Sequence, residues 1–145
     1  MPGTSRTIAI AAPMATVFAV LADFESYPDF LPEIQRAQIH AREAGACEVE
    51  FAAHIVTDLT YTLHCILDPP QRIQWSLIAG EVMTKNDGGW LLREIPGGTE
   101  ATYTIDVGFG PFVPRIVTKM LVGSSLPTFL ERVKKRAEDE KVKGQ

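Results

Sequence analysis

The side chains of this sequence that could carry out metal or nucleophilic chemistry are few and scattered. The three histidines, His40, His54 and His64, lack the close spacing of a local metal site, and the alternation of the chain places His54 and His64 on an outward strand face. No Ser, Cys, His and acid arrangement can be assembled on one inward face. Cys47 and Cys65 have neither CxxC spacing nor a secretory context, which indicates reduced packing thiols. We therefore expect no bound metal.

The glycine pairs and nearby charges indicate turns rather than a cofactor site. Gly88-Gly89 and Gly97-Gly98 do not precede a helix in the way that a phosphate-binding loop requires, so we interpret both as hairpin turns and expect no cofactor. Three charged residues cluster near one of these turns, namely Glu81, Lys85 and Asp87, and we expect their side chains to be solvated.

A different chemistry is offered by aromatic side chains that carry one polar group. Trp75, Trp90, Tyr61 and Tyr103 fall at inward positions of alternating segments, and their N–H and O–H groups need partners when buried. Apolar surroundings with a few such groups are typical of small-molecule sites. Core packing explains each residue taken singly, so both interpretations stay open.

Length and charge limit the possible classes of protein. The chain has 145 residues, 46% of them hydrophobic, which predicts a single domain over 1–145 whose charged tail, about 138–145, frays. No apolar run approaches the roughly 18 to 20 residues that span a bilayer, and residues 1–7 lack a signal peptide, so we expect a cytoplasmic protein. The net charge of −4 argues against nucleic acid as a partner.

Alternating hydrophobicity predicts a strand-rich middle that positions the aromatic residues. A first strand covers 6–12. Six further segments of strand length, separated by short turns, are 34–42, 47–56, 59–67, 72–78, 89–95 and 99–107. A two-residue turn at Thr57-Asp58 would set the apolar face of one strand against the polar face of the next. We therefore predict a longer loop or a bulge there, which aligns the two apolar faces.

Two prolines shape the segment before the strands. Pro13 starts a helix, and residues 27–32 hold prolines four apart that allow only a short helical turn. That turn would present a wedge of Tyr27, Phe30 and Leu31, either as a plain hydrophobic plug or as one end of a cavity.

A long amphipathic stretch follows the strands. Apolar residues recur at helical spacing through 114–137, with most charges on the other side. Gly123 and Pro127 interrupt it, so we expect a kink or short break, with Ser124 or Ser125 capping the restarted turn. A bent helix over a sheet leaves room beneath it.

Several motifs together carry a resemblance to a known family. They are APMATVFAVLADFESYPDFLPEI at 12–34, Asp68-Pro69-Pro70 followed by Arg72-Ile73, and the pair Gly89-Trp90. Over nearly its whole length the chain resembles the polyketide cyclase/dehydrase and coenzyme Q-binding-like branch of the START-like superfamily, also called SRPBCC, helix-grip or birch-pollen-allergen-like. The resemblance implies an α+β helix-grip fold. In it an antiparallel sheet of about seven strands wraps round a long C-terminal helix, with two short helices after the first strand.

The resemblance leaves three functions open, because a fold does not carry one activity. The leading hypothesis is a carrier or chaperone that binds a lipid, an isoprenoid quinone or a polyketide-like aromatic between sheet and C-terminal helix. The alternative is a polyketide cyclase/dehydrase-type enzyme with Tyr61, Tyr103 and Arg93 as candidate catalytic residues. A tyrosine whose pKa is about 10 is a poor base at neutral pH unless a neighbouring charge lowers it. The third is an interaction protein associated with a ribosome or another complex.

Residues from four parts of the chain are expected to face the ligand. They are Phe30 of the wedge; Phe51, Tyr61, Leu63, Trp75, Trp90, Tyr103 and Ile105 of the strands; Phe109 and Phe112 of the following loop; and Val117, Met120, Leu121 and Ser124 of the helix. Phe109 and Phe112 flank a Gly-Pro pair. They either cap the helix start or form a gate that touches a membrane surface transiently.

Overall fold

The computed structural model describes residues 4–55, 57–111, 114–120 and 126–143. Its elements in chain order are β1 (Thr4–Ile10), α1 (Met14–Ala22), the 3-10 helix η1 (Phe24–Asp29), β2 (Ile34–Glu43), β3 (Ala46–Ile55), β4 (Thr57–Asp68), β5 (Arg72–Gly80), β6 (Met83–Ile95), β7 (Gly98–Phe109), α2 (Arg115–Met120) and α3 (Leu126–Lys143).

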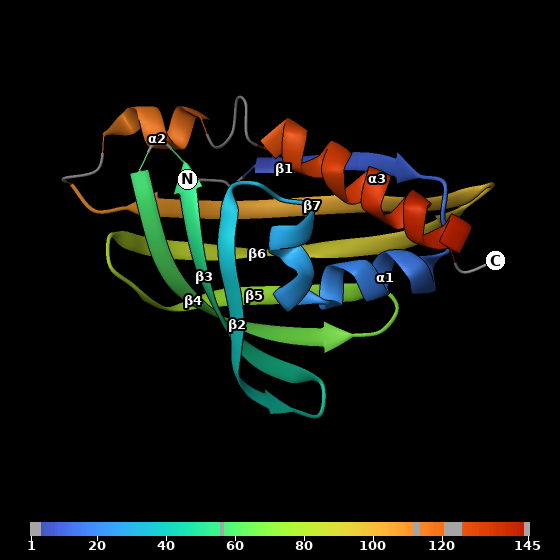
Figure 1. The fold of residues 1–145 in the computed structure, drawn as a ribbon, viewed down its shortest axis with the longest axis horizontal. Coiled ribbons are helices and arrows are strands. Elements are labelled where there is room, and N and C mark those ends of the chain that lie inside the picture. Colours follow the sequence, from blue (N-terminus) through green and yellow to red (C-terminus); the bar gives the residue numbers. More distant parts are fainter. Residues whose placement is uncertain (1–3, 56, 112–113, 121–125, 144–145) are drawn as a thin grey trace.

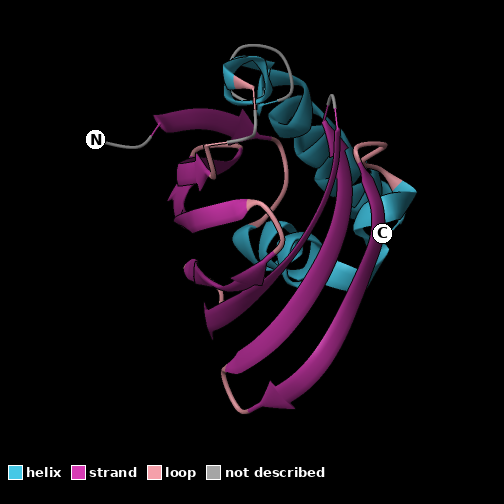
Figure 2. Ribbon diagram, turned by 90° about the vertical axis from the view of Figure 1, so that its left-hand side faces the viewer, coloured by secondary structure: helices cyan, strands magenta, loops and turns pink. Residues whose placement is uncertain are grey.

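The seven strands form one antiparallel sheet in the order β1-β7-β6-β5-β4-β3-β2. From β2 to β7 each strand pairs with the next along the chain, whereas β1 lies beside β7 at the far edge, because α1 and η1 carry the chain across the sheet. The sheet is strongly curved, and α1 and α3 lie on the same face of it (Figures 1 and 2). This arrangement confirms the predicted α+β helix-grip fold.

The pairing of β3 with β4 follows the predicted alignment of apolar faces. Phe51 lies opposite Tyr61 and Val49 lies opposite Leu63, so the apolar faces of both strands point the same way. The longer loop or bulge predicted at Thr57-Asp58 is wrong, because both residues belong to β4, which pairs with β3 without a register shift. A register that set apolar against polar residues would have exposed one whole face, which hydrophobic burial disfavours.

Strand β6 begins earlier than the sequence indicates. Residues 86–88 have the composition of a turn, yet they pair with β7 inside a strand that starts at Met83. The turn prediction at Gly88-Gly89 is therefore wrong, whereas Gly97, with a φ of 83°, lies in the turn before β7. Gly88 is opposite Trp75, and a Cβ at Gly88 would lie only 2.9 Å from that indole ring. The glycine thus makes room for a tryptophan rather than for a turn.

The chain between α1 and β2 forms hydrogen bonds with the two strands β2 and β3. Glu25 of η1 accepts one from the backbone N–H of Ile39 in β2, at 3.0 Å. The backbone carbonyl of Glu33 accepts another from the N–H of His54 in β3, at 2.8 Å. A short helical turn is present and is tied to β2, but it covers Phe24–Asp29 rather than the predicted stretch between the two prolines.

Helix α3 supplies the long apolar face that the sequence predicts. Its buried residues Leu126, Leu130, Val133 and Ala137 belong to the same core as α1 and the inner face of the sheet. Pro127 is the second residue of α3, and the predicted break with its caps Ser124 and Ser125 lies outside the described residues. The charged segment 138–143, predicted as a fraying tail, continues the helix.

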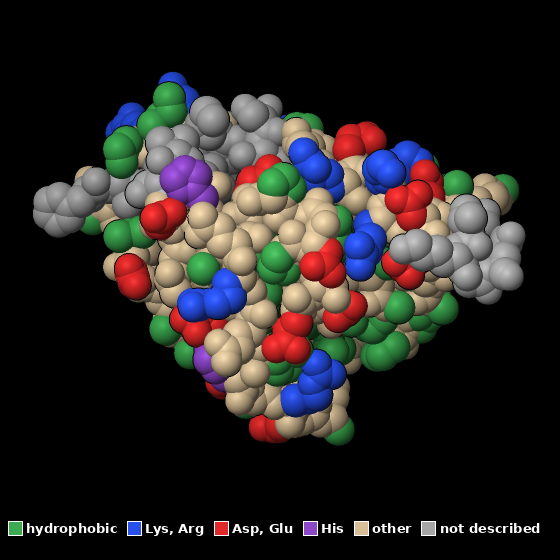
Figure 3. Space-filling model, viewed as in Figure 1, with side chains coloured by type: hydrophobic (Ala, Val, Ile, Leu, Met, Phe, Trp, Pro, Cys, Tyr) green, Lys and Arg blue, Asp and Glu red, His purple; other side chains and the backbone are tan. Residues whose placement is uncertain are grey.

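The outer side of α3 is covered by mixed charges. Ion pairs four residues apart join Lys135 to Asp139 at 3.2 Å and Arg136 to Glu140 at 3.6 Å. On this face of the molecule basic and acidic side chains alternate without a large patch of one sign (Figure 3). Within the described residues, no helix combines the length and apolar character that crossing a membrane requires.

Candidate functional site

A cavity of about 130 Å³ lies between the inner face of the sheet, η1 and the first turn of α3. Most of the side chains around it are apolar or aromatic. The residues that line it are Phe24, Tyr27, Leu31, Glu33, Ile34, Phe51, Tyr61, Leu63, Cys65, Trp75, Asn86, Trp90, Tyr103, Leu126 and Phe129. Two groups of aromatic rings form opposite parts of this wall.

The first group, the η1-side cluster, consists of Phe24, Tyr27, Phe51 and Tyr61. The rings of Tyr27 and Phe51 stack with centroids 5.9 Å apart, and Phe51 contacts Tyr61 at 5.6 Å. The hydroxyl of Tyr27 donates a hydrogen bond of 2.5 Å to the backbone carbonyl of Leu21, near the end of α1. Since the last carbonyls of a helix have no partner within it, this hydroxyl completes the end of α1. Tyr27 and Leu31 thus place the predicted wedge against the cavity.

Phe30, the third predicted wedge residue, does not reach the cavity. It follows η1 with a φ of −133°, and its half-buried ring packs against Tyr27 and beneath Arg136 of α3, whose guanidinium lies 5.1 Å from the ring centroid. Phe30 instead lines a separate surface groove between α1 and α3. The backbone turn after η1 rotates Phe30 out and Leu31 in.

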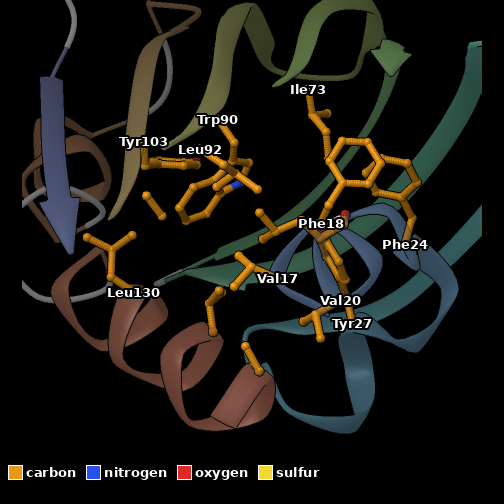
Figure 4. Packing of buried hydrophobic residues seen from close by; sticks show 14 of the residues in the cluster. Val17, Phe18, Val20, Phe24, Tyr27, Ile73, Trp90, Leu92, Tyr103 and Leu130 are labelled. Atoms are coloured by element: carbon orange, nitrogen blue, oxygen red, sulfur yellow. Dashed lines mark hydrogen bonds between the residues drawn. The ribbon is translucent and has the colours of Figure 1, made fainter. Parts of the chain in front are cut away.

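The second group, the α3-side cluster, consists of Trp75, Trp90, Tyr103 and Phe129. The ring centroids of Trp90 and Tyr103 are 4.8 Å apart, and Phe129 of α3 contacts Tyr103 at 5.2 Å. Trp90 and Tyr103 project from neighbouring strands toward the helix that carries Leu130 (Figure 4). The predicted inward residues Trp90 of β6 and Tyr103 of β7 therefore meet the helix, and Trp75 of β5 contacts Tyr103.

A buried amide holds one of these rings in place. Asn86 is 5% exposed and lines the cavity, and its Oδ1 accepts a hydrogen bond of 2.9 Å from Nε1 of Trp75. Its Nδ2 makes a weaker contact of 3.5 Å with Sδ of Met83. Because an indole N–H can only donate, the amide oxygen must face Trp75. Asn86 therefore positions the ring that Gly88 makes room for.

The hydroxyls of Tyr61 and Tyr103 differ from that of Tyr27, because neither forms a hydrogen bond with any described residue. Burial raises the pKa of Tyr61 to about 12. Burial, together with the nearby Tyr61, also raises the pKa of Tyr103. Both phenols are therefore neutral at physiological pH, and each can donate a hydrogen bond but cannot act as a base.

The remaining predicted site residues lie elsewhere or are not described. Arg93 is on the outer face of the sheet and pairs with Glu100 at 2.8 Å, so the structure does not bring it to the cavity. Ile105 is buried in the core, and Phe109, half-buried, lies opposite Met83 at the end of β7. Outside the described residues or side chains are Phe112, Val117, Met120, Leu121 and Ser124.

The potential metal ligands stay apart. His40 contacts Glu50 at 2.7 Å and His54 contacts Asp58 at 2.8 Å, both on the surface. In the ranges that the structure describes, no three His, Cys, Asp or Glu side chains gather as a metal site would require.

Several lining residues were not among the predicted site residues. Phe129 lies three positions after Leu126, so the apolar spacing of the helix could have identified it. Glu33 follows a proline and lines the cavity, and nothing in its local pattern indicates an inward position. Asn86 was concealed because Asn-Asp-Gly is a typical turn sequence.

Comparisons with known proteins agree with this architecture. Residues 10–134 match the family described as polyketide cyclase/dehydrase and lipid transport. Zhui aromatase/cyclase from Streptomyces sp. R1128 is 22% identical over 94% of this chain and 93% of that chain, with a TM-score of 0.84. A START superfamily protein from Mycobacterium smegmatis is 24% identical over 96% and 99%, with a TM-score of 0.82.

A STAR-related lipid transfer protein from Xanthomonas axonopodis is 13% identical over 92% of this chain and 84% of that chain, with a TM-score of 0.76. Identities this low show a shared fold alone. No curated protein sequence matches significantly. The family match covers most of the chain and agrees with the helix-grip architecture, so the chain belongs to the polyketide cyclase/dehydrase and lipid transport family.

Proposed function

We propose that this protein binds a hydrophobic small molecule in the cavity and acts as a carrier or chaperone for it. The observation that carries the proposal is the composition of the cavity wall, which joins two aromatic clusters with a few neutral polar groups. Enclosed apolar surfaces with sparse polar groups are what small-molecule sites have in common. Membership of a family that includes lipid transport supports the same proposal.

The volume of the cavity limits the size of the ligand that it can hold in this conformation. Its volume of about 130 Å³ is close to that of an engineered cavity of about 150 Å³ in another protein that binds benzene. Pockets for drug-sized ligands are larger, about 300 to 1,000 Å³. A single ring therefore fits, whereas an acyl chain or an isoprenoid tail requires the wall to open.

A second candidate function, cyclase or dehydrase chemistry, is favoured by one residue. Glu33 lines the cavity, and its carboxylate has no hydrogen bond or ion pair with the described residues, so it is free to accept a proton. The same family description includes such enzymes. Against it, the neutral phenols of Tyr61 and Tyr103 are not bases, and the described lining contains no Lys, Arg or His.

Ligand binding is tested by native mass spectrometry of freshly purified protein and by thermal denaturation with a panel of lipids, quinones and aromatic compounds. A ligand should raise the Tm in proportion to the logarithm of its concentration and change the fluorescence of Trp75 and Trp90. The variant Leu63→Trp fills the cavity and should abolish the rise in Tm. Ile66→Trp is the matched control, because Ile66 is on the same strand and half exposed. A panel without effect on either signal contradicts the carrier proposal.

Catalysis is tested separately. An enzyme that removes a proton next to a carbonyl should accelerate exchange of the methyl hydrogens of acetophenone in D₂O, as followed by NMR, and Glu33→Gln should abolish the acceleration. A rate equal to that of buffer, with ligand binding intact, rejects the enzyme and leaves the carrier.

A further inference from the structure

Three polar atoms in the cavity wall have no hydrogen-bond partner among the residues that the structure describes. They are the hydroxyl oxygens of Tyr61 and Tyr103 and the indole Nε1 of Trp90, and none of them forms a hydrogen bond with a described residue. Yet every described side-chain nitrogen or oxygen that is fully shielded from solvent does have a partner. Trp90 and Tyr103 are only 3% and 7% exposed as residues, so their polar atoms are reached from the cavity.

Comparable polar groups nearby do form hydrogen bonds within the protein, so the lack of a partner is not general in this region. The hydroxyl of Tyr27 is bonded to a backbone carbonyl, and the indole N–H of Trp75 is bonded to Asn86. Buried polar groups that lack a partner are costly, and native structures keep them mainly where a water molecule or a ligand completes them. Trp90 and Tyr103 belong to the neighbouring strands β6 and β7 and their rings are in contact, whereas Tyr61 belongs to β4, on the other side of β5.

The charges around the cavity decide which partner suits these atoms. Trp90 can only donate a hydrogen bond, so the group that meets it must be an acceptor. A carboxylate on the ligand would lack a counter-ion, because the described lining contains no Lys, Arg or His, and Glu33 would repel it. A neutral carbonyl oxygen accepts hydrogen bonds without that cost.

We propose that the cavity selects a neutral, ring-sized molecule whose carbonyl oxygen accepts hydrogen bonds from the donor wall, defined as Tyr61, Trp90 and Tyr103. This inference rests on the proposed function and names the class of ligand for the same cavity. The rings of the two aromatic clusters hold the body of the ligand, and the donor wall sets its orientation.

The test uses three compounds of nearly equal size: ethylbenzene, acetophenone and benzoate. Binding is measured by NMR titration of the full-length protein at neutral pH. Acetophenone should bind about tenfold more tightly than ethylbenzene, since two hydrogen bonds of ordinary net strength are gained. Benzoate should bind more weakly than either. Equal affinities for ethylbenzene and acetophenone, or preferential binding of benzoate, overturn the inference while the carrier proposal stands. If none of the three binds, the inference fails, while the carrier proposal is decided by the panel of lipids, quinones and aromatic compounds.

Variants of the donor wall test which side chains produce the preference for acetophenone over ethylbenzene. Tyr103→Phe should lower the affinity for acetophenone about three- to tenfold and leave the affinity for ethylbenzene unchanged, because only the hydroxyl is removed. Tyr61→Phe gives an independent test of the same wall if Tyr103→Phe folds poorly. Thr104→Val is the matched control, because it removes a hydroxyl from the exposed face of the same strand. A preference for acetophenone that survives both tyrosine variants contradicts the assignment of the donor wall.

Discussion

The η1-side cluster and the α3-side cluster border the same cavity, and each combines a polar group bonded within the protein, Tyr27 or Trp75, with polar groups that lack a partner among the described residues. In the first, Tyr27 gives its hydroxyl to the carbonyl of Leu21 and so connects two helices. In the second, Trp90 and Tyr103 keep their polar atoms free of the described residues. Their rings make contacts of the same kind, at centroid distances of about 5 to 6 Å in both clusters.

This difference separates structural from functional roles among identical residue types. Ring packing alone cannot do so, because both tyrosines are buried and both have a raised pKa. What distinguishes them is whether the protein itself completes the hydrogen bond. The comparison therefore predicts large losses of stability from removing a packed ring or a bonded hydroxyl, and small losses from removing a free hydroxyl.

The largest effect is expected at Phe24, which is 3% exposed and touches Tyr27 and Phe51. Phe24→Ala should lower the free energy of unfolding by about 3 to 5 kcal/mol, through lost burial and the void that remains. Phe30→Ala is the control and should cost only about 1 to 2 kcal/mol, because Phe30 is half buried against Arg136. Urea denaturation measures both, and equal losses would show that the two rings are equally structural.

High pH should weaken the fold through the buried tyrosines of both clusters. In the unfolded chain a tyrosine ionises at about pH 10. Burial raises the pKa of Tyr61 to about 12 and also raises the pKa values of Tyr27 and Tyr103. The folded state therefore holds protons that the unfolded state releases. The stability contributed by these groups is complete below about pH 10 and is lost as the pH rises toward the folded-state values.

The expected slope is about 1.4 kcal/mol per pH unit for each such tyrosine. Urea unfolding between about pH 9 and 12 measures it, with absorbance of the phenolate as a second signal. Tyr61→Phe should reduce the slope by the contribution of one tyrosine, about 1.4 kcal/mol per pH unit. A stability that does not change over this range would mean that the phenols are open to solvent.

A smaller loss is expected from Tyr27→Phe, which keeps the ring and removes the bond to Leu21. The buried carbonyl at the end of α1 then lacks its partner, at a cost of about 1 to 3 kcal/mol. Thermal denaturation monitored by circular dichroism gives the value. No change in Tm would place a water molecule on that carbonyl and would remove the distinction between Tyr27 and Tyr103.

The smallest effect is expected from Tyr103→Phe without ligand. Its hydroxyl has no partner among the described residues, so its loss should change the unfolding free energy by less than about 0.5 kcal/mol. The same denaturation experiment applies. A loss as large as that of Tyr27→Phe would show that the hydroxyl stabilises the fold itself.

Much of the fold could be predicted because most strand segments alternate with a two-residue period. Burial of Ile73, Trp90, Leu92 and Tyr103 follows from that period, and the alignment of β3 with β4 follows from the need to bury both apolar faces. The helical stripe that ends in α3 is predicted by the same reasoning with a period of 3.6.

Details of the cavity were hidden because long-range packing overrides local signals. Residues 86–88 carry a turn signature, but the indole of Trp75 occupies the space over Gly88 and binds Asn86, which keeps the segment in β6. Phe30 is aromatic and close to Tyr27, yet the backbone angle after η1 turns it toward Arg136. Neither outcome can be obtained from spacing, because each depends on a partner far away in the sequence.

The hydrogen bonds around η1 also bear on kinetics. Tyr27 ties this segment to α1, Glu25 ties it to β2, and the carbonyl of Glu33 ties it to β3. Parting η1 from its surroundings would break the bonds of Tyr27 and Glu25 together, so we expect this end of the cavity to open less readily than the rest of its rim. The residence time of a bound molecule would then be set along the rest of the rim. Substitutions in η1 should accordingly alter how much of the protein is folded rather than the dissociation rate.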